Sequence, residues 1–200
     1  MVNTRKIIKK IIPVNLFGKI GPFVHLLEAV MANVRYNFPS HGMRVIGVTG
    51  TNGKTTTTFL IHKMLSEAGY KVGMMSTVAY GIGNDITSQS EHITTARAGI
   101  LQKRLRDFKN AGVEWLVLEV SSHSLVQYRT WGVSYEIAVM TNVTGDHLDY
   151  HGTFDNYLEA KRRLFKITSK NKNGFGIINA DDLNANKFTN ITSQFTTYGV

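Results

Sequence analysis

Cysteine is absent from the 200-residue sequence, which excludes disulfide bonds and thiolate metal sites. Long apolar runs are also missing, since no stretch approaches the roughly 20 residues that a membrane-spanning helix needs. The amino terminus does not read as a secretory signal, because Lys9, Lys10 and Pro13 interrupt its apolar residues and no small-residue cleavage site follows cleanly. These absences predict a cytoplasmic protein.

Acidic residues are scarce in one part of the chain. The net charge is +9, and residues 1–44 hold seven Lys and Arg against one acid, Glu28, so this segment carries six of the nine charges. Residues 45–200 are therefore close to balanced, which argues against a nucleic-acid-binding face across the main domain. With 42% hydrophobic and 18% charged residues, the composition is that of a soluble globular chain.

Apolar, β-branched runs alternate with helical patterns from Arg44 onward. The predicted strands occupy residues 44–50, 71–77, 114–120, 135–143 and 174–180. The predicted helices occupy residues 55–68, 96–111, 123–130 and 154–168. The strands are apolar on nearly every residue, as in a parallel sheet that is covered on both faces. This alternation predicts a doubly wound α/β fold with a mostly parallel sheet and right-handed crossovers.

Two segments do not follow this alternation. Residues 80–93 are polar and contain glycine, and they predict a loop or a small hairpin over the active edge. Residues 1–43 form a basic helical leader that precedes the domain at 44–200. Its isoleucines and lysines allow peripheral contact between residues 1–20 and an anionic membrane surface. The preferred interpretation is a helical arm packed on its own domain or on a missing one.

Glycine, lysine and threonine dominate the stretch "VIGVTGTNGKTTTTFLI". Within it, "GTNGKT" lies between a strand and a helix, where backbone N–H groups and the helix N-terminus can hold phosphates. Lys54 would reach the β- and γ-phosphates of ATP, and the Thr55 hydroxyl would bind Mg²⁺. Val48 replaces the usual first glycine, but a simple glycine-rich helix cap would not explain Lys54 and the four threonines. The predicted ATP-binding residues are Gly50, Thr51, Asn52, Gly53, Lys54, Thr55 and Thr56.

Polar residues also follow two other predicted strands. Glu119 ends one strand and precedes "SSHSLVQYR", and a second strand ends in "TGDHLDYHG". Because ligands of open α/β sheets bind beyond the carboxyl ends of strands, Lys54, Glu119 and His147 are expected to converge on one crevice. A transition-metal site in "DHLDYH" is the weaker alternative, since Gly152 and the preceding strand favour a loop over a helix. His123 has no clear role, and the default interpretation is a histidine that packs in the domain or supports the site residues from behind.

Four motifs in this order resemble those of the Mur ligases, which build the peptide stem of bacterial cell-wall precursors. They are "TGTNGKTTT", "EVSSHSLVQYR", "TNVTGDHLDYHG" and "YLEAKRRLF". The likeness covers about residues 45–200 and is greatest to the type that adds the third stem residue to UDP-N-acetylmuramoyl-L-alanyl-D-glutamate. It implies a central ATPase domain of the Mur ligase fold, incomplete at its carboxyl end.

The resemblance implies a carboxylate–amine ligase. ATP would phosphorylate the terminal carboxylate of the UDP-muramoyl dipeptide, and the amine of an amino acid would attack the acyl phosphate, leaving an amide, ADP and phosphate. The triphosphate and the carboxylate repel each other, and Lys54 with two Mg²⁺ ions would neutralise that charge.

The resemblance also assigns roles to individual residues. Catalysis would rest on Lys54, Lys161 and His147, with one Mg²⁺ on Thr55 and Glu119 and another on His147. Lys161 matches the lysine that these enzymes carbamylate, and once carbamylated it would be an acidic group that helps to bind Mg²⁺. Its neighbours Arg162 and Arg163 alone would suggest a solvated helix face. The substrate-binding residues implied are Thr94, Thr95, Ser121, Gln127 and Arg129. Ser121 could equally cap the helix that follows it.

The chain departs from this family at both ends. Residues 1–43 are too short for the usual uridine-binding domain, and the sequence stops at "FTTYGV", before the domain that selects the amino acid. A non-catalytic nucleotide-binding fragment is therefore one alternative. Another is a related ligase acting on a folate, poly-glutamate or lipid-linked muramoyl substrate. The sequence predicts neither the amino acid added nor the oligomeric state.

Overall fold

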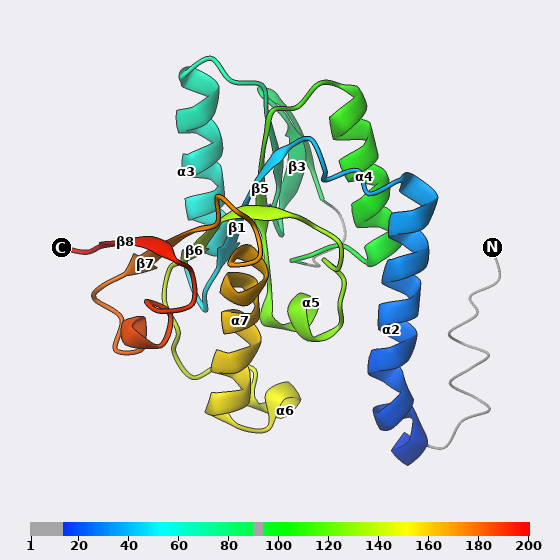
Figure 1. Ribbon diagram of the computed structural model, residues 1–200, viewed down its shortest axis with the longest axis vertical. Helices are drawn as coiled ribbons and strands as arrows, with labels where there is room; N and C mark the ends of the chain where they lie inside the picture. The colour runs from blue at the N-terminus through cyan, green and yellow to red at the C-terminus, as the bar shows by residue number, and fades with distance from the viewer. Residues whose placement is uncertain (1–13, 90–93) are drawn as a thin grey trace.

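The computed structural model describes residues 14–89 and 94–200, with side chains from Gly21 onward. Its centre is an eight-stranded sheet in the order β4-β3-β2-β5-β1-β6-β7-β8 (Figure 1). The strands are β1 (Arg44–Thr49), β2 (Val72–Met75), β3 (Ala79–Ile82), β4 (Asp85–Ser88), β5 (Trp115–Glu119), β6 (Tyr135–Met140), β7 (Phe175–Asn179) and β8 (Gln194–Tyr198). Six neighbouring strands of the sheet, β2, β5, β1, β6, β7 and β8, pair in parallel. Strand β3 pairs with β2 and β4 in antiparallel fashion. The predicted mostly parallel α/β sheet is confirmed.

The helices alternate with the strands as predicted. They are α2 (Val14–Tyr36), α3 (Lys54–Glu67), α4 (Ala98–Asn110), α5 (Ser122–Val126), α6 (Leu148–His151), α7 (Phe154–Thr168) and the 3-10 turn η1 (Ala185–Lys187). The helix predicted at 123–130 is shorter, because Tyr128 has a left-handed backbone with φ 53°. The hairpin predicted within 80–93 is formed by β3 and β4, and residues 90–93 lie outside the described part of the chain.

The prediction of a loop in "DHLDYH" is wrong for Leu148–His151, which form the short helix α6. His147 precedes this turn with φ 52°, and Gly152 follows it with φ 77°. Both residues have a positive φ, which ends a helix, so the helix between them has a single turn. Glycine adopts a positive φ easily at the end of a helix. The helix orients the side chains that follow β6.

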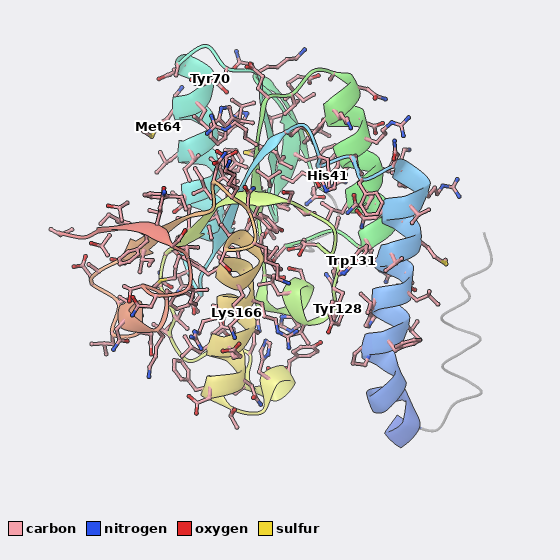
Figure 2. The ribbon with its side chains drawn as sticks, viewed as in Figure 1. His41, Met64, Tyr70, Tyr128, Trp131 and Lys166 are labelled. Carbon is pink, nitrogen blue, oxygen red and sulfur yellow. The ribbon has the colours of Figure 1, made fainter. Side chains whose placement is uncertain are left out.

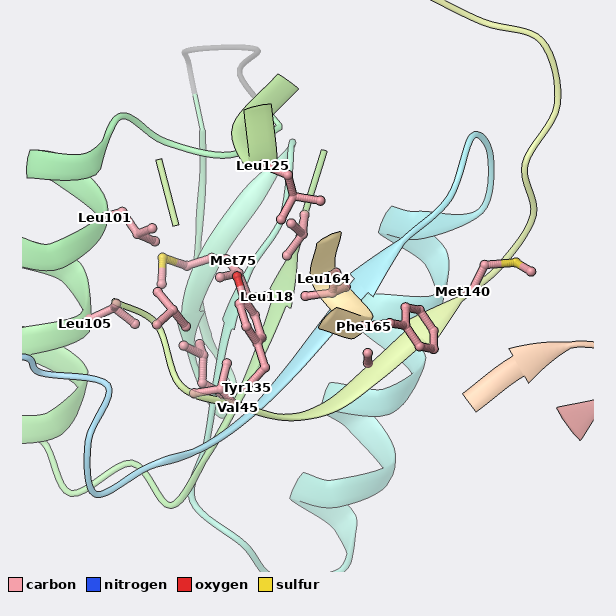
Figure 3. Packing of buried hydrophobic residues seen from close by; sticks show 14 of the residues in the cluster. Val45, Met75, Leu101, Leu105, Leu118, Leu125, Tyr135, Met140, Leu164 and Phe165 are labelled. Carbon is pink, nitrogen blue, oxygen red and sulfur yellow. The ribbon is translucent and has the colours of Figure 1, made fainter. Parts of the chain in front are cut away.

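Helices cover both faces of the sheet, as a doubly wound fold requires. On one face, Ile61 and Leu65 of α3 pack against the apolar side chains of β1, β2, β5 and β6. On the other face, α4 and α7 bury a larger core, and Figure 3 shows Leu101 and Leu105 directed toward Met75 and the strands. The sheet interior is therefore dry on both sides, which explains strands that are apolar on nearly every residue.

The register of the central strands determines where the polar residues meet. Val48 of β1 lies beside Glu119 of β5, and Thr49 lies beside Met140 of β6. All three strands run in parallel, so the segments that follow them emerge at the same edge of the sheet. The "GTNGKT" loop, the segment after Glu119 and the segment after Met140 consequently lie next to one another.

Helix α2 lies at the outer edge of the molecule beside α4 (Figure 1). Ala29 and Ala32 are buried against Ala98 and the ring of Trp131, and the Asn33 amide donates to the Trp131 carbonyl over 2.6 Å. The described part of the leader is thus a helical arm packed on the domain. In the described residues no helix is long and apolar enough to cross a membrane. The membrane contact predicted for residues 1–20 lies outside the described residues and side chains, and stays a prediction.

Candidate active site

The loop between β1 and α3 is held by the end of β6. The backbone N–H of Thr51 donates to Asn142 O over 2.8 Å, and the N–H of Asn52 donates to the side-chain oxygen of Asn142 over 2.9 Å. The Thr141 hydroxyl donates to Asn52 O over 2.7 Å. Gly50 packs against this hydroxyl so closely that a Cβ there would lie 1.8 Å from it. The loop backbone is therefore fixed before any ligand binds.

Lys54 and Thr55 begin α3 and extend from the loop toward two different partners. The Lys54 ammonium donates to Thr51 O over 2.7 Å, which folds the side chain back over the loop. Burial lowers the pKa of Lys54, and the negative charges of Glu119 and Asp146 oppose that shift. The Thr55 hydroxyl donates to a carboxylate oxygen of Glu119 over 3.0 Å. The loop thus presents a cation and a hydroxyl at the helix N-terminus.

Glu119 is a buried carboxylate with several donors around it. Glu119 is 1% exposed. Thr77 donates two hydrogen bonds to the Glu119 carboxylate, one from its backbone N–H over 2.8 Å and one from its hydroxyl over 3.0 Å. The Thr55 hydroxyl is its third donor. A carboxylate and a hydroxyl with adjacent oxygens are suitable ligands for a hard divalent cation such as Mg²⁺. The residues present therefore fit the ion predicted at Thr55 and Glu119.

Lys161 is buried in the centre of α7 rather than solvated. It is 1% exposed, its ammonium donates to Gly50 O over 2.6 Å, and it lies 4.4 Å from the centre of the Tyr157 ring. Burial lowers the pKa of Lys161 to about 7, the positive charge of Lys54 lowers it further, and Asp146 opposes the shift. The solvated helix face suggested by its arginine neighbours is wrong, because residues 111 positions apart meet here.

Four of the five predicted substrate-binding residues are linked by hydrogen bonds, and the fifth, Thr94, lines the same crevice. Arg129 donates to Thr95 O over 2.9 Å and, through Nε, to the Gln127 side-chain oxygen over 2.9 Å. The Thr95 hydroxyl is 3.2 Å from Glu119 O and 3.5 Å from the Ser121 hydroxyl. Ser121 also caps α5 by accepting from the N–H of Ser124 over 3.2 Å. The capping role weighed for Ser121 is therefore real, and its hydroxyl still faces the same crevice.

Three histidines lie close together in this part of the site. The His123 ring lies 4.8 Å from the ring of His147 and 5.4 Å from that of His151. Burial, followed by the charges of His147, His151 and Arg129, lowers the pKa of His123 to about 4, while Asp149 opposes the shift. Among the described residues no group of three or more His, Asp or Glu is placed to hold one metal ion. His123 is accordingly neutral near pH 7, contacts two other histidine rings and lines the crevice described below, and its role stays a prediction.

One crevice of about 230 Å³ brings together seven of the fifteen predicted residues. It is lined by Gly50, Lys54, Thr94, Ser121, Ser122, His123, Arg129, His147, Tyr157 and Lys161. Thr55, Glu119 and Thr95 adjoin it through the hydrogen bonds described above, and Gln127 adjoins it through Arg129. Thr56 does not line it, and instead borders a hollow between α3 and the β3–β4 hairpin. The predicted ATP contact of Thr56 stays a prediction.

Two residues of the site were missed from the sequence. Thr77 follows β2 and holds Glu119, and its place beyond the carboxyl end of a parallel strand was the available signal. Tyr157 precedes Lys161 by four positions on α7, a spacing that puts both on one helix face. Its hydroxyl lies 3.0 Å from the Thr51 hydroxyl, so it joins α7 to the loop between β1 and α3.

Removing the Tyr157 hydroxyl is expected to weaken this junction. Because the Tyr157→Phe variant keeps the ring beside Lys161 but loses the bond to Thr51, we expect a loss of about 1 kcal/mol in the free energy of unfolding. Urea denaturation monitored by circular dichroism measures it. Tyr70→Phe is the matched control, because Tyr70 is 44% exposed and contacts Trp115 through its ring edge. If Tyr157→Phe and Tyr70→Phe changed the free energy of unfolding equally, the hydrogen bond between Tyr157 and Thr51 would not stabilise the fold.

The parallel sheet, the glycine-rich loop before α3 and the adjacent hydroxyl and carboxylate define the class of nucleotide-binding α/β domains with a phosphate-binding loop. Within this class, residues 48–200 match the family model described as the Mur ligase middle domain, and the chain belongs to that family. Members of this family use ATP and Mg²⁺.

Individual relatives agree with this assignment. The UDP-N-acetylmuramoyl-L-alanyl-D-glutamate–2,6-diaminopimelate ligase of Clostridium botulinum is 43% identical over 173 residues, which are 86% of this chain and 34% of the relative. A solved structure of a ligase with the same description matches at 33% identity and a TM-score of 0.73, covering 86% of this chain and 36% of that one. Folate enzyme FolC of E. coli shares the fold at 20% identity and a TM-score of 0.65, over 86% of this chain and 46% of its own. The chain thus spans about a third of the length of its curated relatives.

Proposed function

We propose that the chain supplies the ATP-binding centre of a ligase that joins an amino acid to UDP-N-acetylmuramoyl-L-alanyl-D-glutamate, through an acyl phosphate. The observation that carries the proposal is the convergence of Lys54, Glu119, Lys161 and Arg129 on one crevice beyond the carboxyl ends of parallel strands. The relatives named for this reaction support the substrate class. The folate alternative rests on a likeness of fold alone.

Each group has a chemical task in this proposal. Bound ATP supplies the phosphoryl group, which passes to the terminal carboxylate of the dipeptide with release of ADP. Lys54 neutralises phosphate charge, and Thr55 with Glu119 would hold one Mg²⁺. His147 lies at the rim of the same crevice and would help to hold the second ion. The amine then attacks the acyl carbon, and phosphate leaves.

Arg129 is the group in the crevice best suited to the dipeptide. Its guanidinium is held by Thr95 O and by the side chain of Gln127, so its direction is set before a ligand arrives. A planar guanidinium binds carboxylate or phosphate through two parallel bonds. Thr94 and Ser121 line the same wall and would contribute neutral hydrogen bonds to the substrate.

We also propose that Lys161 is carbamylated. Its lowered pKa of about 7 leaves much of the amine unprotonated at neutral pH, and the unprotonated nitrogen can attack carbon dioxide and release a proton to solvent. The carbamate keeps one N–H, so the bond to Gly50 O survives the modification. It also replaces a cation near Lys54 with an anion, which removes the repulsion between the two lysines.

Carbamate formation is expected to increase with pH. At fixed dissolved carbon dioxide, ¹³C NMR of the chain should show a carbamate signal that grows as the pH is raised through about 7, because Lys161 loses its proton in that range. Lys161→Arg is the control, since an arginine keeps its charge and does not react. A signal of equal strength in that variant, or none at alkaline pH, would refute carbamylation of Lys161.

Release of ADP tests the proposed reaction. The purified chain is incubated with Mg-ATP, bicarbonate and diaminopimelate, with and without the UDP-muramoyl dipeptide, and Lys54→Ala serves as the inactive control. Turnover that needs the dipeptide would support the ligase. ATP binding without turnover would favour the non-catalytic nucleotide-binding module, and failure to bind ATP would contradict both.

A further inference from the structure

We propose that the outward face of α2 docks the protein on the surface of an anionic lipid bilayer. This face is formed by Phe23, Leu27, Met31 and Val34, and is called the α2 stripe below. The four side chains are 71%, 52%, 60% and 63% exposed. Their spacing of four, four and three residues places them along one side of the helix over roughly 16 Å.

Helix α2 exposes large apolar side chains on its outward face, where a helix at a water-facing surface normally carries polar ones. Such helices normally bury their apolar stripe and present charge to solvent. Here the small residues Ala29 and Ala32 face the domain, together with Asn33, which donates to Ala29 O over 2.9 Å and to Trp131 O. The four residues of the α2 stripe face outward instead, while Val24, Leu26 and Val30 are half-buried. Arg35 is exposed on this helix, and the side chain of Glu28 is 43% exposed.

Basic residues precede the α2 stripe in the sequence and are exposed on the neighbouring helix α4. The sequence of residues 1–20 holds five Lys and Arg and no acid. On the neighbouring helix α4, Lys103, Arg106 and Lys109 are exposed, and Arg106 donates to Tyr36 O at the end of α2 over 3.3 Å. Glu28 is the one acid of α2, and it lies 3.8 Å from His25. Asp107 is the one acid of α4, against four Lys and Arg, so the charge near the α2 stripe is net positive. An apolar stripe with this charge matches a bilayer that carries anionic headgroups.

A second copy of the chain is a poorer occupant. A dimer would bring together two chains that each carry a net charge of +9, and this repulsion opposes association. Four side chains also fall short of the roughly 800 Å² per partner of a stable protein–protein interface. A bilayer needs only a shallow apolar insertion with electrostatic attraction. The charge and the size of the face therefore favour lipid.

Vesicle co-sedimentation of the whole chain tests the proposal. We expect binding to phosphatidylcholine vesicles that contain phosphatidylglycerol, weak binding to phosphatidylcholine alone, and a decrease at high salt. Changing Phe23, Leu27, Met31 and Val34 together to Gln should lower the bound fraction about tenfold, because the apolar insertion is lost. Leu60→Gln with Met64→Gln is the matched control, since these residues of α3 are equally exposed, at 58% and 69%.

The lack of cysteine allows a second, site-specific measurement. A polarity-sensitive dye on Leu27→Cys should shift to the blue when anionic vesicles are added, whereas the dye on Met64→Cys should not, because Met64 lies on α3, across the molecule from α2 (Figure 2). Binding that is unchanged in the fourfold variant would mean that the leader charge acts alone, and would overturn the proposal. So would absence of binding, or dimers in sedimentation equilibrium that dissociate in the fourfold variant.

Discussion

Replacing Lys54 with Ala is expected to weaken Mg-ATP binding by about 100-fold or more. The ammonium lies at the N-terminus of α3 beside the loop backbone, with Thr51 O as its partner 2.7 Å away. Its contacts to phosphate would be charge-assisted hydrogen bonds, each worth about 1.5 to 3 kcal/mol. Two such contacts account for a loss of about 3 kcal/mol, which is the expected change in affinity.

Isothermal titration with Mg-ATP measures this loss, and a lysine on the same helix provides the control. Lys63 is 75% exposed and pairs with Glu67 over 3.3 Å. Because exposed ion pairs contribute little, Lys63→Ala should leave the affinity within about twofold. Urea denaturation of both variants separates a binding defect from a folding defect. Equal affinities of Lys54→Ala and Lys63→Ala would contradict the assignment of Lys54 to the phosphates.

The order of strands and helices could be predicted from the sequence because local patterns carry it. Apolar runs marked the parallel strands, and the glycines with Lys54 marked the loop at the end of β1. The crevice followed from a topological rule, since segments after parallel strands emerge at one edge. These predictions needed no knowledge of distant contacts. The same reasoning failed at Tyr128, which has a left-handed backbone just after α5 and packs against the alanines of α2 and α4.

The burial of Lys161 and the orientation of α2 could not be predicted from local patterns. Lys161 lies between residues of mixed polarity, and its environment depends on Gly50, which is 111 positions away. On α2, apolar residues occur on both sides of the helix, so periodicity alone did not indicate which side meets the domain. Only contact with α4 and Trp131 decided it. Both features arise from long-range packing, which a local pattern does not encode.

Gly50→Ala is expected to lower the free energy of unfolding by about 2 to 4 kcal/mol and to abolish nucleotide binding. A Cβ at this position would lie 1.8 Å from the Thr141 hydroxyl and 3.1 Å from Asn142 O. The hydroxyl cannot move away without losing its bonds to Asn52 O, at 2.7 Å, and Thr49 O, at 3.3 Å. Since Lys161 also donates to Gly50 O, displacement of this backbone would disturb both lysines of the crevice.

A double-mutant cycle distinguishes this clash from a general effect of adding a methyl group. In the Gly50→Ala background, Thr141→Ala removes the clashing oxygen, and we expect it to recover at least about 1 kcal/mol, because residues in contact are coupled. Gly145→Ala is the control for the added methyl, since a Cβ there meets nothing within 4 Å, and it should change stability by less than about 0.5 kcal/mol. Additive effects of Gly50→Ala and Thr141→Ala in chemical denaturation would contradict the clash. Recovery of stability without recovery of Mg-ATP binding would instead show that the Thr141 hydroxyl is needed to hold the loop in its phosphate-binding shape.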